Sequence, residues 1–296
     1  MRTVCLLCLA VAVHAASLSD TLREHIAGFS GTVSLYAKNL DTGKAIGIRE
    51  TEPVRTASTI KLPIMTAVFD AVSRGEAKWT DMLTVTAAEK VAGTGIIASE
   101  LSDGVQLPLR DVLNLMIVLS DNTATNMILQ RIPAEEVNRY LDKLGLATTR
   151  SMRKIMGSEG HPADLGYSTA GKLPENRKYG LGMSTPRDMV TILEKLARGE
   201  IVSPAASEDM IAILKRTQDS TGIPRHLGGV PVAHKIGSLE ALRSDVGIVY
   251  SKNGRIAMAI TVDGMPKADW SPDNPGSLLI ADLAKILVDG LGSANK

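Results

Sequence analysis

Cysteine and aromatic residues are scarce in this 296-residue chain. Its two cysteines, Cys5 and Cys8, both lie within the first 16 residues. If that segment is removed, no thiol remains, which excludes a disulfide framework, a cysteine nucleophile and cysteine metal ligands. Aromatic residues make up 3% of the chain, the net charge is +1, and no basic run is present. We therefore expect no nucleic-acid partner, since such binding needs a basic surface.

Several catalytic signatures are also absent. The chain has no H-E-x-x-H zinc motif, and its histidines beyond the first 16 residues are scattered: His25, His161, His226 and His234. It has no G-x-S-x-G nucleophile elbow either, which argues against a Ser-His-Asp hydrolase of that type. We expect no metal and no other cofactor.

The N-terminal segment 1–16 predicts a signal peptide. Arg2 precedes an apolar stretch that starts at Val4, and the small residues Ala15 and Ala16 end the segment. This order is typical of a secretory signal. The stretch is too short to span a membrane, and no later stretch is long and apolar enough. We expect a secreted or periplasmic monomer without a membrane span.

Strand patterns occur at both ends of the chain. Strands are predicted over 32–38, 45–49, 232–236, 245–250 and 255–262. Asn253-Gly254 supplies the hairpin turn between the last two, because both residues adopt positive φ at little cost. Apolar residues at helical spacing then predict a helix over 277–289, closed by Gly290.

The middle of the chain is predominantly helical. The segment after Ser58 is apolar on several faces, which is typical of a buried helix. Pro63 fits only in its first turn, so this helix should begin near Thr59 or Ile60. Further helices are expected over 109–119 and 133–144, and from an N-cap at Thr185 to Gly199.

These patterns favour an α/β fold of the α+β type. A predominantly antiparallel five-stranded sheet is built from both chain ends and packed by helices, with an inserted all-α domain. The predicted limits are 17–57 plus 203–296 for the α/β domain and 58–202 for the all-α domain.

Three short motifs carry the chemistry: Ser58-Thr59-Ile60-Lys61, Ser120-Asp121-Asn122 and Lys235-Ile236-Gly237. The first places a serine and a lysine on one helical face. Serine is a weak nucleophile that needs a base, and a desolvated lysine near a second cation can serve because its pKa is lowered. These residues are what acyl transfer through a serine ester requires. Another S-x-x-K match, at 151–154, is interpreted as a chance occurrence in a loop.

In order and type, the motifs resemble the S-x-x-K, S-D-N and K-[TS]-G elements of class A serine β-lactamases and penicillin-binding proteins. The resemblance covers roughly 30–290 and implies an α/β domain, an all-α domain and a site in the cleft between them. It implies Ser58 as nucleophile, Lys61 as base and Ser120 as proton relay to the leaving nitrogen. Asn122 would hold the substrate amide.

The third motif implies the substrate-binding side of the site. Lys235 would bind an anionic group of the substrate and Gly237 would line the site beside it. The backbone N–H groups of Ser58 and Ser238 would form the oxyanion hole. Arg243 is a candidate second contact to a substrate carboxylate, or else a solvated surface charge. Strand alternation places His234 on the face opposite Lys235, as a packing residue rather than a base.

The chain departs from the family pattern twice. Ile236 stands where the family has a hydroxyl, which removes a hydrogen-bond donor to the substrate carboxylate. No E-x-x-x-N pattern occurs between 146 and 185, where class A enzymes carry the glutamate that activates the deacylating water. Glu175 and Glu159 are the candidate substitutes, although loop carboxylates are usually exposed.

Three hypotheses follow. The first is an exported β-lactamase that opens β-lactams through an acyl-Ser58 ester. The second is a D-alanyl-D-alanine peptidase or an esterase acting on a peptidoglycan-like or ester substrate with the same residues. The third is a penicillin-binding sensor that acylates without turnover, because the water-activating acid is missing.

Overall fold

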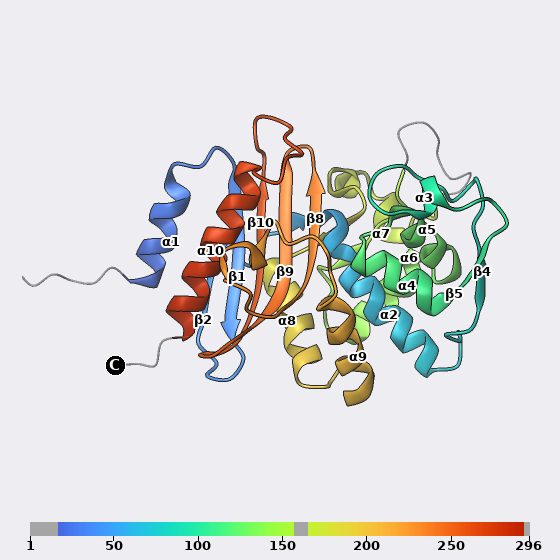
Figure 1. Ribbon diagram of the computed structural model, residues 1–296, viewed down its shortest axis with the longest axis horizontal. Helices are drawn as coiled ribbons and strands as arrows, with labels where there is room; N and C mark the ends of the chain where they lie inside the picture. Colours follow the sequence, from blue (N-terminus) through green and yellow to red (C-terminus); the bar gives the residue numbers. More distant parts are fainter. Residues whose placement is uncertain (1–16, 157–164, 293–296) are drawn as a thin grey trace, which may run out of the picture.

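A computed structural model describes residues 17–156 and 165–292 (Figure 1). The segment 1–16, predicted as a signal peptide, and the candidate base Glu159 lie outside the described residues.

Both chain ends contribute to a five-stranded antiparallel sheet, which confirms the predicted fold class. The strand order is β2-β1-β10-β9-β8. Backbone pairing sets Leu35 opposite Ile260 and Lys235 opposite Val246. Each predicted strand overlaps an observed one: β1 (Thr32–Asn39), β2 (Ala45–Ile48), β8 (Val232–Leu239), β9 (Leu242–Ser251) and β10 (Gly254–Asp263).

One face of the sheet is covered by α1 (Leu18–Ala27) and α10 (Pro275–Gly292), seen together at the left of Figure 1. Their buried residues, including Leu22 and Leu283, form one apolar core with Leu35 of β1. Helix α10 confirms the helix predicted over 277–289. Chain segments from opposite ends of the sequence thus share this core.

The other face packs against α8 (Pro186–Ala197) and α9 (Pro204–Leu214). Thr185 caps α8 as predicted, since its side chain accepts from the Asp188 N–H at 3.0 Å. Helix α8 contacts β1 and β10 although it lies within 58–202, the range predicted for the all-α domain. The sheet layer therefore includes a helix from that range.

The remaining helices gather beyond β8 (Figure 1). Helix α2 is buried on nearly every side, as its apolar sequence predicts. The elements of this region are α2 (Lys61–Ser73), α3 (Ile97–Glu100), α4 (Leu109–Val118), α5 (Asn122–Arg131), α6 (Ala134–Lys143) and α7 (Thr169–Lys172). The smaller elements are β3 (Val54–Arg55), β4 (Met82–Thr84), β5 (Gln106–Pro108), β6 (Arg150–Ser151), β7 (Gly182–Ser184), and the 3-10 helices η1 (Ala57–Ile60), η2 (Pro174–Tyr179) and η3 (Ile223–His226). Across 17–156 and 165–292, no helix has the length and apolarity to cross a membrane.

Candidate active site

The three motifs meet in a cleft of about 320 Å³ where the helices adjoin β8. Ser58 comes from η1, Ser120 and Asn122 from the turn and helix start after α4, and Lys235 from β8. The other lining residues are Gly93, Thr94, Val118, Leu119, Thr217, Gln218, Asp219, Ile236, Gly237, Ser238 and Trp270.

Ser58 lies in η1, and α2 begins directly after that turn, at Lys61. The two residues are three positions apart and therefore share a helical face. Ser58 is not the N-cap residue of either helix, because Thr56 precedes η1 and Ile60 precedes α2. The residue before it, Ala57, has a φ of 45°, a conformation uncommon for a residue with a side chain. The serine thus stands at a tight, half-buried turn facing the cleft.

Gly237 lets β8 lie directly against the backbone of Ser58. A Cβ at this position would stand 2.8 Å from the Ser58 nitrogen and 2.8 Å from the Thr56 carbonyl oxygen. Both are backbone atoms, so neither can rotate away. Glycine is therefore required here by close approach rather than by an unusual φ.

Lys61 is completely buried and is bonded to the second motif. Its Nζ donates to the Ser120 carbonyl oxygen at 2.7 Å and to Asn122 Oδ1 at 3.0 Å, and lies 3.2 Å from Ser120 Oγ. Burial, reinforced by the charge of Lys235, holds the pKa of Lys61 well below the usual range for lysine, while Asp121 opposes this. The environment therefore favours a neutral amine that can accept a proton.

Lys235 approaches Ser120 from the opposite wall. Its Nζ donates to Ser120 Oγ at 3.0 Å and to the Ile236 carbonyl oxygen at 2.8 Å. Burial lowers its pKa to about 8, with Asp245 and Asp219 acting in the other direction. Ser120 Oγ thus lies between the two lysine amines.

Asp121 fixes the position of Ser120 and Asn122. It caps α5 by accepting from the Ala124 N–H at 2.8 Å. Its Oδ2 accepts the backbone N–H groups of Ile96 and Ile97, at 2.7 and 2.9 Å. This buried carboxylate ties the segment 92–97, which forms one wall of the cleft, to the start of α5. Ser120, beside Asp121, has a φ of 55°.

Thr94 belongs to the wall that Asp121 anchors. Its hydroxyl donates to the Ser120 carbonyl oxygen at 2.6 Å, and its carbonyl oxygen accepts the Asn122 N–H at 3.0 Å. No motif predicted Thr94, because the segment 92–96 has no recognisable pattern.

Arg243 is not among the residues that line the cleft. Its guanidinium donates to three backbone carbonyl oxygens, of Leu239 at 2.6 Å, Leu242 at 2.7 Å and Asp269. It also stacks on the ring of Trp270, 5.0 Å from the centroid, and the residue is only 4% exposed. The alternative of a solvated surface charge does not fit this burial.

His234 is buried on β8 and pairs with Asp245 of β9, Nδ1 to Oδ1 at 3.0 Å. Asp245 Oδ2 also accepts the Ile223 N–H at 2.8 Å. His234 does not line the cleft, in keeping with a packing role.

The structure does not bring Glu175 to the cleft. This residue is exposed in the first turn of η2, and Asp219 is the one carboxylate among the cleft-lining residues of the described chain. The other S-x-x-K match, at 151–154, is buried elsewhere, with Lys154 paired to Glu89 at 2.9 Å.

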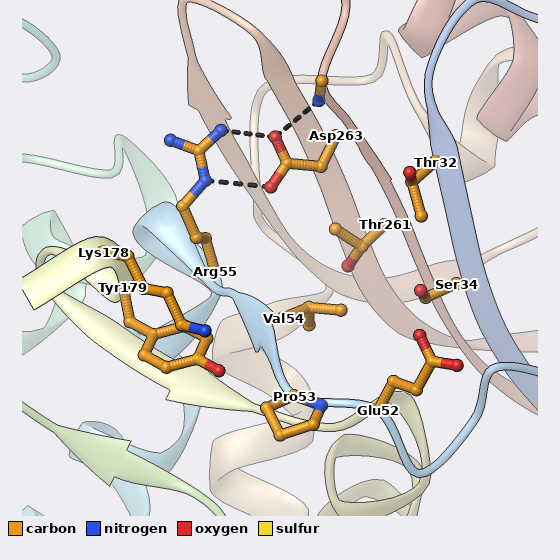
Figure 2. A pocket seen from close by; sticks show the side chains of 11 residues that line it. Thr32, Ser34, Glu52, Pro53, Val54, Arg55, Lys178, Tyr179, Thr261 and Asp263 are labelled. Carbon is orange, nitrogen blue, oxygen red and sulfur yellow. Dashed lines mark hydrogen bonds and ion pairs between the residues drawn. The ribbon is translucent and has the colours of Figure 1, made fainter. Parts of the chain in front are cut away.

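A larger cavity, of about 510 Å³, is lined by residues of β1, β3, β10 and η2 (Figure 2). None of the predicted site residues lines it. Figure 2 shows Arg55 and Asp263 paired across one end of it, and Arg55 Nε donates to Asp263 Oδ2 at 2.9 Å. This pair ties β3, three residues before Ser58, to the end of β10. We place the chemistry in the smaller cleft because Ser58 and Lys235 line it and the buried Lys61 is bonded to Ser120 and Asn122 of its lining.

Comparison with known proteins agrees with this geometry. The model of the β-lactamase enzyme family matches residues 17–291. A β-lactamase of Bacillus amyloliquefaciens is 28% identical over 89% of this chain and 80% of its own. The structure of a β-lactamase from Sphaerobacter thermophilus superposes with a TM-score of 0.78 at 28% identity, covering 95% and 98% of the two chains. That of PBP-A gives 0.77 at 30% identity, covering 92% and 94%. With three motifs in one cleft and a match over almost its whole length, the chain belongs to the β-lactamase enzyme family.

Proposed function

We propose that this protein hydrolyses β-lactams through an ester on Ser58. The observation that carries the proposal is the placement of Ser120 Oγ between the Nζ atoms of Lys61 and Lys235, in the cleft that Ser58 lines. Lys61 is suited to accept a proton, and Lys235 to carry a positive charge.

In the proposed acylation, neutral Lys61 takes the Ser58 hydroxyl proton as Oγ attacks the lactam carbonyl carbon. The developing oxyanion is placed near the N–H groups of Ser58 and Ser238. The carbon–nitrogen bond then breaks, and the nitrogen receives a proton through the Ser120 hydroxyl. Lys235 offers its charge to the substrate carboxylate, and Asn122 its amide to the acyl side chain.

Hydrolysis of the ester then adds water across the bond to Ser58 Oγ, returning the serine and releasing a second carboxylate. Intact-mass spectrometry with excess benzylpenicillin tests both steps. We expect an adduct on Ser58 that appears and then disappears as penicillin is consumed. Ser58→Ala should give no adduct, and persistent labelling of that variant would refute the assignment.

A second candidate function is a penicillin-binding sensor or peptidase that retains its acyl group. Glu175 is exposed away from the cleft, and the described cleft offers Asp219 as its carboxylate. In the same mass experiment, an adduct that outlasts the free penicillin would support this candidate. If the wild-type adduct disappears instead, Asp219→Asn and Glu175→Gln identify the acid, since only the variant lacking the true base should accumulate acyl-enzyme.

We also propose export directed by the segment 1–16, whose sequence has the order of a secretory signal. Fractionation of cells expressing the full chain tests this. Mature protein in the periplasm or medium, starting after Ala15 or Ala16, supports export, whereas full-length protein in the cytoplasm contradicts it.

A further inference from the structure

Trp270 is the most exposed large apolar residue of the described chain, with 65% of its surface accessible. It lies between β10 and α10 and lines the same cleft as Ser58 and Ser238. Most exposed apolar side chains need no explanation, but an indole presented into a catalytic cleft is an apolar surface where a substrate can bind.

The loop that carries Trp270 is fixed on both sides of the ring. The preceding residue, Asp269, accepts at its carbonyl oxygen from Arg243 and from Asn274 Nδ2, the latter at 2.8 Å. The Asp269 side chain accepts the Ser271 N–H at 2.8 Å. Asn274 in turn accepts the N–H groups of Gly276 and Ser277 at the start of α10. The indole is therefore held by the loop rather than left free to collapse.

Arg243 packs against one face of the Trp270 ring. Its buried guanidinium is stacked 5.0 Å from the indole centroid and is itself bonded to three carbonyl oxygens. Because the guanidinium covers one face of the ring and Trp270 is still mostly accessible, the other face of the ring is open to a ligand in the cleft. Arg243 thus positions Trp270.

We propose that Trp270 is a binding platform for a planar aromatic or heteroaromatic ring carried by the substrate. This subsite deepens the proposed function and rests on it. Offset or edge-to-face aromatic contacts favour such a partner over an aliphatic group of the same substrate. In this proposal Trp270 sets preference among substrates and takes no part in breaking the bond.

The first test compares acylation rates within matched substrate pairs. One pair is a phenylacetyl and an acetyl penicillin; the other is a cephalosporin with a heteroaryl or a methyl group at the ring position remote from the amide. Trp270→Ala should slow acylation by the ring-bearing member of at least one pair by about two- to tenfold, the range expected for one aromatic contact. The partner without the ring should change less than twofold, and Trp270→Phe should recover most of the loss. Equal effects within both pairs, or no effect on any substrate, would overturn the platform.

A second test separates the platform from the acyl chemistry. The chain has two tryptophans, so Trp79→Phe leaves Trp270 as the sole tryptophan, and its emission is followed with excitation selective for tryptophan over tyrosine. In a Ser58→Ala, Trp79→Phe protein, the ring-bearing penicillin should change the emission saturably and the acetyl penicillin should bind more weakly. If the wild-type protein is not acylated, the proposed function fails, while this signal still reports ring binding. Equal affinity for both penicillins would contradict the platform even if acylation is normal.

Discussion

At the residue scale, the central feature is one hydroxyl shared by two lysines. Lys61 and Lys235 both lie within hydrogen-bond distance of Ser120 Oγ, at 3.2 and 3.0 Å. Two ammonium groups in a buried site repel each other, so one of them is favoured in the neutral form. The charge of Lys235 lowers the pKa of Lys61, whereas Asp245 and Asp219 act to raise that of Lys235, which assigns the neutral form to Lys61 and leaves the charge on Lys235.

This assignment predicts a bell-shaped pH dependence of acylation by an anionic β-lactam. The rate rises as Lys61 loses its proton, and falls as the pH passes about 8, where Lys235 becomes neutral. Lys235→Arg keeps its charge to much higher pH, so its alkaline fall should be absent below pH 10. Stopped-flow acylation rates measure both profiles. An alkaline fall at the same pH in both proteins would show that another group titrates.

A second prediction concerns Gly237. Gly237→Ala should slow acylation at least tenfold and destabilise the protein by about 1–3 kcal/mol, because its Cβ must displace backbone at Ser58 or Thr56. Gly28→Ala is the matched control, since that Cβ meets nothing within 4 Å and φ is −95°. Acylation rates and denaturant titrations measure the two effects. An active, stable Gly237→Ala protein would contradict the close packing of β8.

Sequence spacing indicates which of the candidate site residues lie together where the geometry is local. Ser58 in η1 and Lys61 at the start of α2 are three residues apart, and Ser120 and Asn122 follow the end of α4. The partners of Arg243 were not predictable in this way. They depend on how the segment 264–274, which has no periodic pattern, returns to β9.

At the scale of elements, the bounds of strands and helices whose apolar residues recur at regular spacing were predicted to within a few residues, including those of β10 and α10. The short sheet of β3, β7 and β6 was not, because each strand has only two or three residues and is defined by its partners. The same holds for the wall at 92–97, which Asp121 holds to α5. Tertiary contacts, rather than periodicity, determine these parts.

That role of Asp121 can be tested. Asp121→Ala should cost about 1–3 kcal/mol in the free energy of unfolding, because a helix cap is lost and the N–H groups of Ile96 and Ile97 lose their acceptor. Acylation should also slow, since the wall through Thr94 holds the Ser120 carbonyl oxygen. Ser203→Ala removes the cap of α9, which accepts from Ala206 N at 3.1 Å, and lies outside the cleft lining. It should lose stability but keep its acylation rate. Equal acylation rates in both variants would refute the claim that Asp121 holds Ser120 in place for acylation.

At the scale of the whole molecule, the helical region and the sheet are joined by one apolar core. This core includes Ile64 and Met65 of α2, together with Val246, Ile248 and Ala257 of the sheet. The site lies across the same junction, because Ser58 precedes α2 and Lys235 lies on β8. The region predicted as an all-α domain therefore shares its apolar core with the sheet.

We therefore predict a single cooperative unfolding transition, although larger chains with two regions often show more. Ile64→Ala in the shared core and Leu283→Ala on the opposite face of the sheet should each cost about 2–5 kcal/mol, since both side chains are fully buried. Calorimetry should show each variant lowering the temperature of the same transition, with far-UV circular dichroism and tryptophan emission changing together. Trp79 lies beside the shared core, whereas α10 covers the far face of the sheet. If the helical region unfolded as a separate unit, the tryptophan emission of Ile64→Ala would change before its far-UV signal. Leu283→Ala would not show this difference. Such a split would mean that the core does not couple the two regions, and that the cleft could open while the sheet stays folded.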